Sequence, residues 1–304
     1  MAASLRKTEN SLPESAGIDT WSDAEILAAF VGGQERAIAA VKAAIPHISK
    51  AANAIAACLA NDGRLFYAGA GTSIRIGVQD GSELPATFGM AEDKIQYLIA
   101  GGRAAMFDTL ADAEDDAVAG RQAASACKAG DALIAIAASG STPYTIAAAR
   151  RARELGSIVV AVVNNPNSAL AAAADIEILL DSGPEVITGS TRMGAGTAQK
   201  AALNFLSTLV HTKLGAVHDG MMVNVRADNL KLKARAGGIV SRIAKVSEND
   251  AAAALELVKG EVKSAVLISA GAGSPAAAQQ LLLESKGNLR LALSRLAATR
   301  KVLK

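Results

Sequence analysis

The chain has 304 residues, of which 51% are hydrophobic and 20% charged, and its 31 basic and 29 acidic residues leave a net charge of +2. This composition is typical of a globular protein with a sizeable core and excludes a disordered chain. Because there is no long basic block, nucleic-acid binding is not expected. Because no segment resembles a signal peptide or a membrane span, a cytoplasmic protein without membrane contact is expected.

Residues 1–50 are expected to form an N-terminal helical segment. Ser22, Asp23 and Glu25 form a helix-start signal, and an amphipathic pattern continues over residues 26–44. Pro46 interrupts this pattern, and a second helix is predicted over residues 48–59.

After residue 51 the apolar pattern becomes strand-like. Short apolar runs, each followed by glycine, serine or asparagine, occupy residues 64–68, 95–99, 132–137, 158–163 and 176–180. Helical stretches lie between them, at residues 112–128, 143–155 and 168–174. Continuous apolar strands separated by helices predict a parallel sheet covered on both faces. A doubly wound α/β domain is therefore expected over residues 51–235, with its ligand beyond the carboxyl ends of the strands.

The last part of the chain has no strand pattern. A long helix is predicted over residues 195–214, and shorter helices joined by glycines follow at residues 251–258, 261–269, 275–285 and 289–296. Residues 236–304 are therefore expected to form a small separate helical bundle.

Three loops at predicted strand-to-helix junctions are rich in glycine, serine and threonine. Each offers close backbone approach, hydroxyl donors and a helix amino end, which together favour binding of a phosphate. Ordinary turn chemistry is the alternative. The candidate phosphosugar-binding residues are Gly71, Thr72, Ser73, Ser139, Gly140, Ser141, Thr142, Ser190, Thr191 and Arg192. Neither a P-loop nor a complete dinucleotide fingerprint is present, so no nucleotide cofactor is implied.

Two glutamates are candidates for acid–base chemistry. Glu83 lies in a segment poor in other acids, and Glu114 begins an acidic run at the predicted start of the helix over residues 112–128. Each could serve a phosphosugar pocket. Glu83 could instead be a surface acid, and Glu114 could compensate a helix dipole. Sequence spacing does not show whether the two meet. The three histidines are scattered without metal-ligand spacing, so no metal site is expected.

The residues that carry a family resemblance extend from residue 8 to about residue 235. The blocks are Gly63–Ser73, Ser82–Gly89, Leu98–Gly102, Ala113–Asp116, Ala137–Gly140 with Thr142–Tyr144, Gly183–Arg192 and Ala195–Lys200, together with the opening Thr8–Asn10. In these blocks the chain resembles the N-acetylmuramic acid 6-phosphate etherases of the sugar isomerase (SIS) superfamily. Residues 236–304 resemble the ubiquitin-associated-like helical domain of that family.

The resemblance implies a carbon–oxygen lyase that splits the lactyl ether of its sugar phosphate into N-acetylglucosamine 6-phosphate and D-lactate. The implied route is elimination followed by addition of water. The catalytic glutamates of the family correspond to Glu83, which would protonate the departing lactate, and Glu114, which would remove the proton from carbon 2. No metal or organic cofactor is implied. A homodimer is expected, with the site where two subunits meet.

The chain departs from the family pattern at two cationic positions. It has Ser141 where the family has an arginine, and Gly194 where the family has a lysine. These losses beside an anionic substrate keep two alternatives open, a non-catalytic sugar-phosphate sensor and a phosphosugar isomerase with another substrate. The presence of both glutamates favours the etherase.

Overall fold

The computed structural model describes residues 6–108, 112–226 and 230–302. The chain divides into two compact units. We call them the sheet unit (Met1–Ser82 and Asp93–Leu209) and the bundle unit (Glu83–Glu92 and Val210–Lys304).

Five parallel strands form the centre of the sheet unit. They are β1 (Leu65–Gly69), β2 (Ile95–Ile99), β3 (Ala132–Ala137), β4 (Ile158–Val163) and β5 (Ile176–Leu179), in the spatial order β2-β1-β3-β4-β5. Their register pairs Leu65 with both Ile95 and Ala132. The doubly wound α/β class is confirmed, and every predicted strand lies within a residue of its observed bounds.

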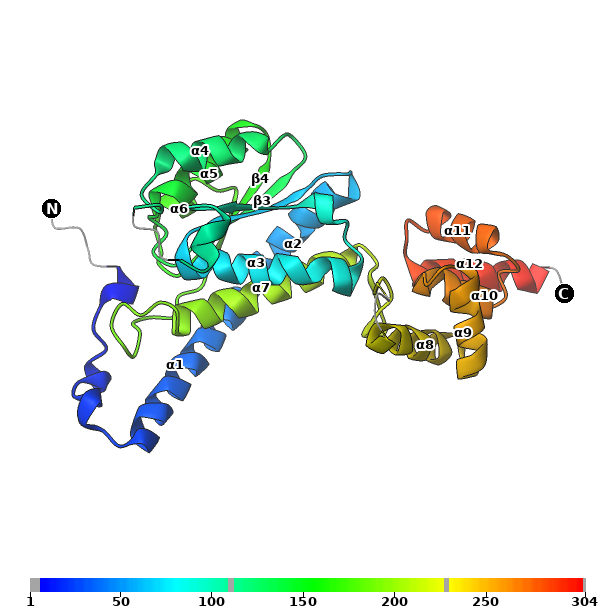
Figure 1. Cartoon of the computed structure of the whole chain (residues 1–304), viewed down its shortest axis with the longest axis horizontal. Coiled ribbons are helices and arrows are strands. Elements are labelled where there is room, and N and C mark those ends of the chain that lie inside the picture. The colour runs from blue at the N-terminus through cyan, green and yellow to red at the C-terminus, as the bar shows by residue number, and fades with distance from the viewer. Residues whose placement is uncertain (1–5, 109–111, 227–229, 303–304) are drawn as a thin grey trace. The chain divides into compact units, whose positions relative to one another are not determined.

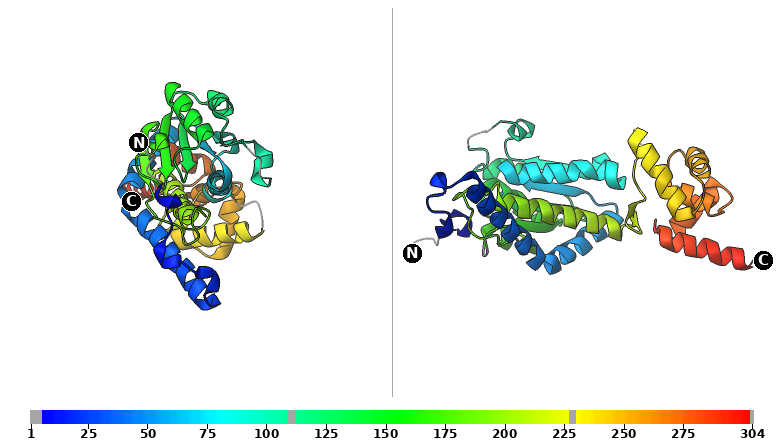
Figure 2. Two further views of the ribbon diagram at one scale, coloured as in Figure 1. Left: turned by 90° about the vertical axis from the view of Figure 1, so that its left-hand side faces the viewer. Right: turned by 90° about the horizontal axis from the view of Figure 1, so that it is seen from below.

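Helices cover both faces of this sheet (Figure 1). The helices of the sheet unit are α1 (Asp23–Ala43), α2 (Ile45–Ala60), α3 (Gly71–Phe88), α4 (Ala117–Ala123), α5 (Pro143–Glu154), α6 (Ala169–Ala172) and α7 (Gly194–Lys213), of which α3 and α7 end in the bundle unit. One face carries α4, α5 and α6, and the other carries α2, α3 and α7. Figure 2 shows α3 and α7 side by side.

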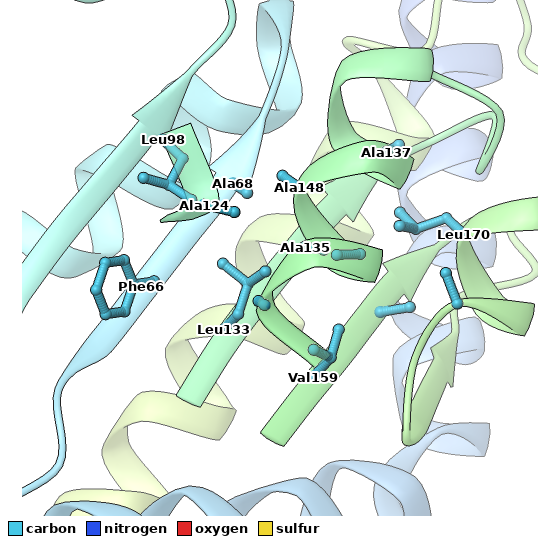
Figure 3. Packing of buried hydrophobic residues seen from close by; sticks show 14 of the residues in the cluster. Phe66, Ala68, Leu98, Ala124, Leu133, Ala135, Ala137, Ala148, Val159 and Leu170 are labelled. Atoms are coloured by element: carbon cyan, nitrogen blue, oxygen red, sulfur yellow. The ribbon is translucent and has the colours of Figure 1, made fainter. Parts of the chain in front are cut away.

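Small side chains let α5 lie close on the sheet. Ala148, Ala149 and Ala152 of this helix are fully buried against strand residues that include Phe66 and Leu133 (Figure 3). Alanine loses no side-chain rotamer freedom on burial and permits close approach of backbones. The alanine-rich composition is therefore used for tight helix-on-sheet packing.

The sequence predictions give no bounds for helix α3, because Gly71, Gly77, Gly81 and Pro85 are poor helix formers. Tertiary packing explains why this segment is nevertheless helical. A Cβ added at Gly77 would lie 2.9 Å from Ile136 Cδ1, and one at Gly81 would lie 2.7 Å from the Tyr97 hydroxyl. The glycines therefore allow α3 to lie directly on the sheet, and the packing offsets their low propensity.

The bundle unit has its own core. It contains the short strands β6 (Val217–His218) and β7 (Met221–Met222) and helices α8 (Leu230–Ala244), α9 (Glu248–Leu257), α10 (Val262–Ser269), α11 (Pro275–Glu284) and α12 (Leu289–Val302). Its buried residues include Val225, Val240, Val266 and Leu267. The four helices predicted for residues 251–296 are present, whereas α8 was not anticipated.

Candidate active site

The strand order places a topological switch point between β1 and β3. The chain leaves β1 toward one edge of the sheet for β2 and returns on the other side for β3. Ligands of open parallel sheets bind beyond the carboxyl ends of the strands at such a point. The segments that flank it are residues 70–73 after β1, which include the first residues of α3, and residues 138–142 after β3. Two of the three loops selected from the sequence therefore lie at the position that the topology favours.

The loop after β1 opens directly into α3. The first helical hydrogen bond runs from the Ile74 N–H to the Ala70 carbonyl at 3.3 Å. The amides of Gly71, Thr72 and Ser73 therefore precede the intrahelical ladder. Gly71 has a φ of +53° and is exposed, with open space where a Cβ would be. This helix end can accept an anion through backbone amides and the helix dipole.

The loop after β3 supplies hydroxyl groups. The Ser139 hydroxyl accepts hydrogen bonds from the Ser141 amide at 3.2 Å and from the Ser141 hydroxyl at 3.1 Å. Thr142 is the N-cap residue of α5, but its side chain makes no capping hydrogen bond. Gly140 has a φ of +65°, and an added Cβ would lie 2.3 Å from Ser168 Cβ. The loop shape therefore requires glycine at this position and presents its hydroxyls half-buried.

Glu114 is held beside this second loop. The Tyr144 amide donates to the Glu114 carbonyl at 3.0 Å, one residue into α5. The helix predicted over residues 112–128 begins only at Ala117, because the Asp116 carboxylate accepts the Ala119 amide at 2.8 Å and caps it there. Glu114 therefore lies in the turn before the helix, with an exposed side chain, and does not act as a first-turn acid.

The third candidate loop differs from the other two. The Glu185 carboxylate accepts the Gly194 amide at 2.9 Å and the Ala195 amide at 2.8 Å, and its residue is 4% exposed. A carboxylate of the protein therefore already occupies the amino end of α7. Ser190 and Thr191 are half-buried beside this end, and Arg192 is exposed.

The start of α7 nevertheless lies next to the first loop. A Cβ added at Gly196 would lie 3.7 Å from Thr72 Cγ2 and 3.3 Å from the Thr191 carbonyl oxygen. Thr72 and Thr191 thus border the same small space. The first and third loops are neighbours through this contact.

Glu83 lies further along α3. It is twelve residues beyond Gly71 (83 − 71 = 12), which at 1.5 Å per residue is about 18 Å along the helix axis. Its side chain is exposed, and it belongs to the short segment that groups with the bundle unit. Glu114 is thus next to the loop residues of the sheet unit, whereas Glu83 is several turns away from the amino end of α3.

A buried carboxylate that sequence reasoning missed fixes α3 against α7. Asp80 is 3% exposed and accepts hydrogen bonds from the Tyr67 hydroxyl at 2.7 Å, the Asn204 amide at 2.7 Å and the Ser207 hydroxyl at 2.9 Å. Burial, and then the nearby Asp80 charge, raise the pKa of Tyr97 to about 12. Asp80 therefore sets how α3 lies beside α7.

The N-terminal segment also reaches the carboxyl edge of the sheet. Thr8 is 1% exposed, and its hydroxyl accepts the Asn165 side-chain amide at 3.0 Å. The same amide group donates to the Ala138 carbonyl of the second loop at 2.9 Å. Both Thr8 and Glu185 fall in blocks that carry the family resemblance, so the motif pattern was the signal that could have found them.

Two further findings concern the described part of the chain. None of its helices combines the length and apolarity needed to cross a membrane. Among these residues, no group of three or more His, Cys, Asp or Glu side chains is arranged to hold a metal ion.

Comparison with known proteins defines the class first. Residues 33–164 match the family model of the SIS domain. Among solved structures, a phosphoheptose isomerase from Francisella tularensis is 19% identical, with a TM-score of 0.48, over 63% of this chain and all of that chain. The family match places an SIS domain at residues 33–164 of the chain.

Sequence relatives then give the particular family. The chain is 45% identical to an N-acetylmuramic acid 6-phosphate etherase of Deinococcus radiodurans over 279 residues, which cover 91% of this chain and 92% of the relative. It is 48% identical to an etherase of the same name from Symbiobacterium thermophilum over 262 residues, or 86% and 87% of the two chains. The chain belongs to the N-acetylmuramic acid 6-phosphate etherase family, which confirms the resemblance.

Proposed function

We propose that this protein cleaves the lactyl ether of N-acetylmuramic acid 6-phosphate to N-acetylglucosamine 6-phosphate and D-lactate, with Glu83 and Glu114 as the acid–base pair. Sequence identities of 45% and 48% to two etherases, over most of the chain, support the reaction. The observation that carries the site assignment is the bond from the Tyr144 amide to the Glu114 carbonyl. It holds Glu114 next to a hydroxyl-rich loop at the topological switch point.

The substrate phosphate is bound between the first two loops. The amides of Gly71, Thr72 and Ser73 face it from the amino end of α3, and the hydroxyls of Ser139, Ser141 and Thr142 face it from the second loop. The third loop contributes through the side chains of Ser190, Thr191 and Arg192. Its helix amides do not take part, because Glu185 already accepts those of Gly194 and Ala195.

Gly194, which stands where the family has a lysine, is compatible with this arrangement of the phosphate site. A Cβ added at Gly194 would lie 3.0 Å from Glu185 Oε2 and 3.6 Å from Oε1. A side chain at this position would therefore crowd the buried Glu185 carboxylate, and glycine leaves room for it. The α7 amides that Glu185 accepts stabilise its charge.

The chemistry requires one carboxylate and one carboxylic acid. In the open-chain aldehyde, Glu114 first removes the proton from carbon 2, and Glu83 then protonates the ether oxygen on carbon 3. The carbon–oxygen bond breaks, a double bond forms between carbons 2 and 3, and D-lactate leaves. Water then adds its oxygen to carbon 3, and carbon 2 regains a proton. Each general acid or base contributes about 10²–10⁴-fold to such a reaction.

The two glutamates of one site come from two subunits of a homodimer. Glu83 is about 18 Å along α3 from the amides that begin the phosphate site, a separation larger than a sugar phosphate spans. The partner subunit's Glu83 can supply the acid if α3 of each protomer borders the site of the other. The reaction takes place in the cytoplasm, in keeping with the two free thiols Cys58 and Cys127.

Release of D-lactate from N-acetylmuramic acid 6-phosphate tests the function. The wild-type chain is expected to release it, and Glu83→Gln and Glu114→Gln are expected to lower the rate at least about 10²-fold. In deuterated water, Glu83→Gln should still exchange the carbon 2 proton, whereas Glu114→Gln should not. Glu35→Gln is the matched control, since Glu35 is an exposed glutamate of α1.

Absence of lactate with the wild-type chain, with binding of the sugar phosphate retained, would indicate a sensor instead of an enzyme. Exchange of the carbon 2 proton by Glu114→Gln at the wild-type rate would show that the base is another residue.

A further inference from the structure

The bundle unit contains a cavity that plays no part in the proposed reaction. Its volume is about 1210 Å³, slightly larger than the usual range for small-molecule pockets. Its wall comes from the segment Val223–Arg226 and from residues of α8, α9 and α10, with Leu282 and Gly287. All of these residues belong to one compact unit.

Lys263 is the partly buried cation of this wall. Its ammonium group donates one hydrogen bond, to the Gly287 carbonyl at 2.7 Å. A lysine ammonium has three N–H donors, and no carboxylate among the described residues lies within 4 Å of it. Burial lowers the pKa of Lys263 to about 8. The charge is therefore desolvated without a counter-ion of the protein, which is costly unless an anion is supplied.

The other charges of the wall do not neutralise this one. Lys233, Lys259, Glu248 and Glu256 are exposed, and exposed charges interact weakly through water. The Glu261 carboxylate accepts a hydrogen bond from the Ser264 hydroxyl at 3.0 Å. Glu261 is the N-cap residue of α10, but its side chain makes no capping hydrogen bond.

Other residues of the wall are apolar. Val225 and Val262 are 4% and 2% exposed, and Leu255 and Leu282 are half-buried. A ligand that matches this wall carries an anionic group and an uncharged body of about sugar size.

We propose that this cavity binds a small organic anion whose phosphate or carboxylate group pairs with Lys263. The site shares no residue with the hydroxyl loops of the sheet unit. The anionic group could belong to a sugar phosphate or to an aliphatic acid, and the test distinguishes these two sources.

Chemical labelling of lysines in the full-length protein tests the proposal. At pH 8 about half of a lysine with a pKa near 8 is the reactive neutral amine, against about 0.3% of an ordinary lysine. Acetic anhydride labelling is followed residue by residue by mass spectrometry, with inorganic phosphate, N-acetylglucosamine 6-phosphate or hexanoate present. Lys231, an exposed residue of α8 outside the cavity wall, is the internal control.

A probe at ten times its dissociation constant is expected to slow labelling of Lys263 about tenfold, while labelling of Lys231 is unchanged. Protection by the sugar phosphate or by hexanoate identifies the source. In calorimetric titrations, Lys263→Met should lose binding of that probe at this site and Lys231→Met should keep it. Protection by none of the three probes, or equal protection of both lysines, would overturn the proposal. Neither result depends on whether D-lactate is released in the etherase assay.

Discussion

Mixing two inactive variants tests whether one active site takes its glutamates from two subunits. Glu83→Gln and Glu114→Gln are each expected to be nearly inactive alone. If the partner's Glu83 works with Glu114 of this chain, a mixed dimer has one intact site and one site that lacks both carboxyls. Random assembly at equal amounts gives about half mixed dimers, and half of their sites are intact. Activity is therefore expected to return to about one quarter of the wild-type value per site.

The structural basis for a site shared by two subunits is the position of Glu83 on α3. The residue is about 18 Å along the helix from Gly71, while Glu114 is held by its backbone at the start of α5. The assay is D-lactate release after the two variants have been co-refolded, with mixed dimers counted by native mass spectrometry. As a control, Glu83→Gln is mixed with the double variant Glu83→Gln/Glu114→Gln, a combination in which no intact site can form.

Activity that stays at the single-variant level, in a sample with mixed dimers, would show that both glutamates act from the same chain. A light-scattering mass near the 30.8 kDa of one chain would refute the shared site altogether.

Three further predictions concern positions whose chemistry the structure makes clear. Gly140→Ala should lower the free energy of unfolding by about 1–3 kcal/mol and weaken phosphosugar binding in calorimetry, because its Cβ would overlap Ser168; unchanged values for both would contradict the required loop shape. Burial raises the pKa of the Asp131 carboxyl, but hydrogen bonds from Arg64 and from backbone amides outweigh it and hold this pKa below 3.8. The stability that this carboxylate contributes is thus present above that pH and is lost as pH falls through its lower folded pKa. Asp131→Asn should therefore lower the free energy of unfolding by about 3 kcal/mol at pH 7, measured by urea titration, and should flatten the loss of stability in acid. An unchanged acid profile would show that other carboxyls dominate. Glu185→Ala should lower the free energy of unfolding by about 1–3 kcal/mol by leaving two helix amides unpaired, and a neutral result in the same urea titration would mean that water replaces the carboxylate.

Several local patterns were sufficient to predict elements of the fold. The five apolar runs became strands because a strand buried on both faces needs a continuous apolar sequence. Pro143 marked the start of α5 correctly, because proline is suited to the first turn of a helix. Ser22 and Glu25 form the capping box that their spacing predicts.

Other features depended on partners distant in the sequence. Local propensity opposes a helix through Gly77 and Gly81, and only contact with Ile136 and Tyr97 makes it favourable. The predicted equivalence of the three loops failed for the third, because Glu185 binds the amides that an anion would have used.

The sequence by itself determined the strands, the helical segments with strong patterns, the family and the candidate residues, since these depend on periodicity and on short motifs. The tertiary structure alone decided which loops flank the switch point, which helix ends keep free amides and where Glu114 lies. These follow from strand order and long-range hydrogen bonds, which join residues that no local pattern connects.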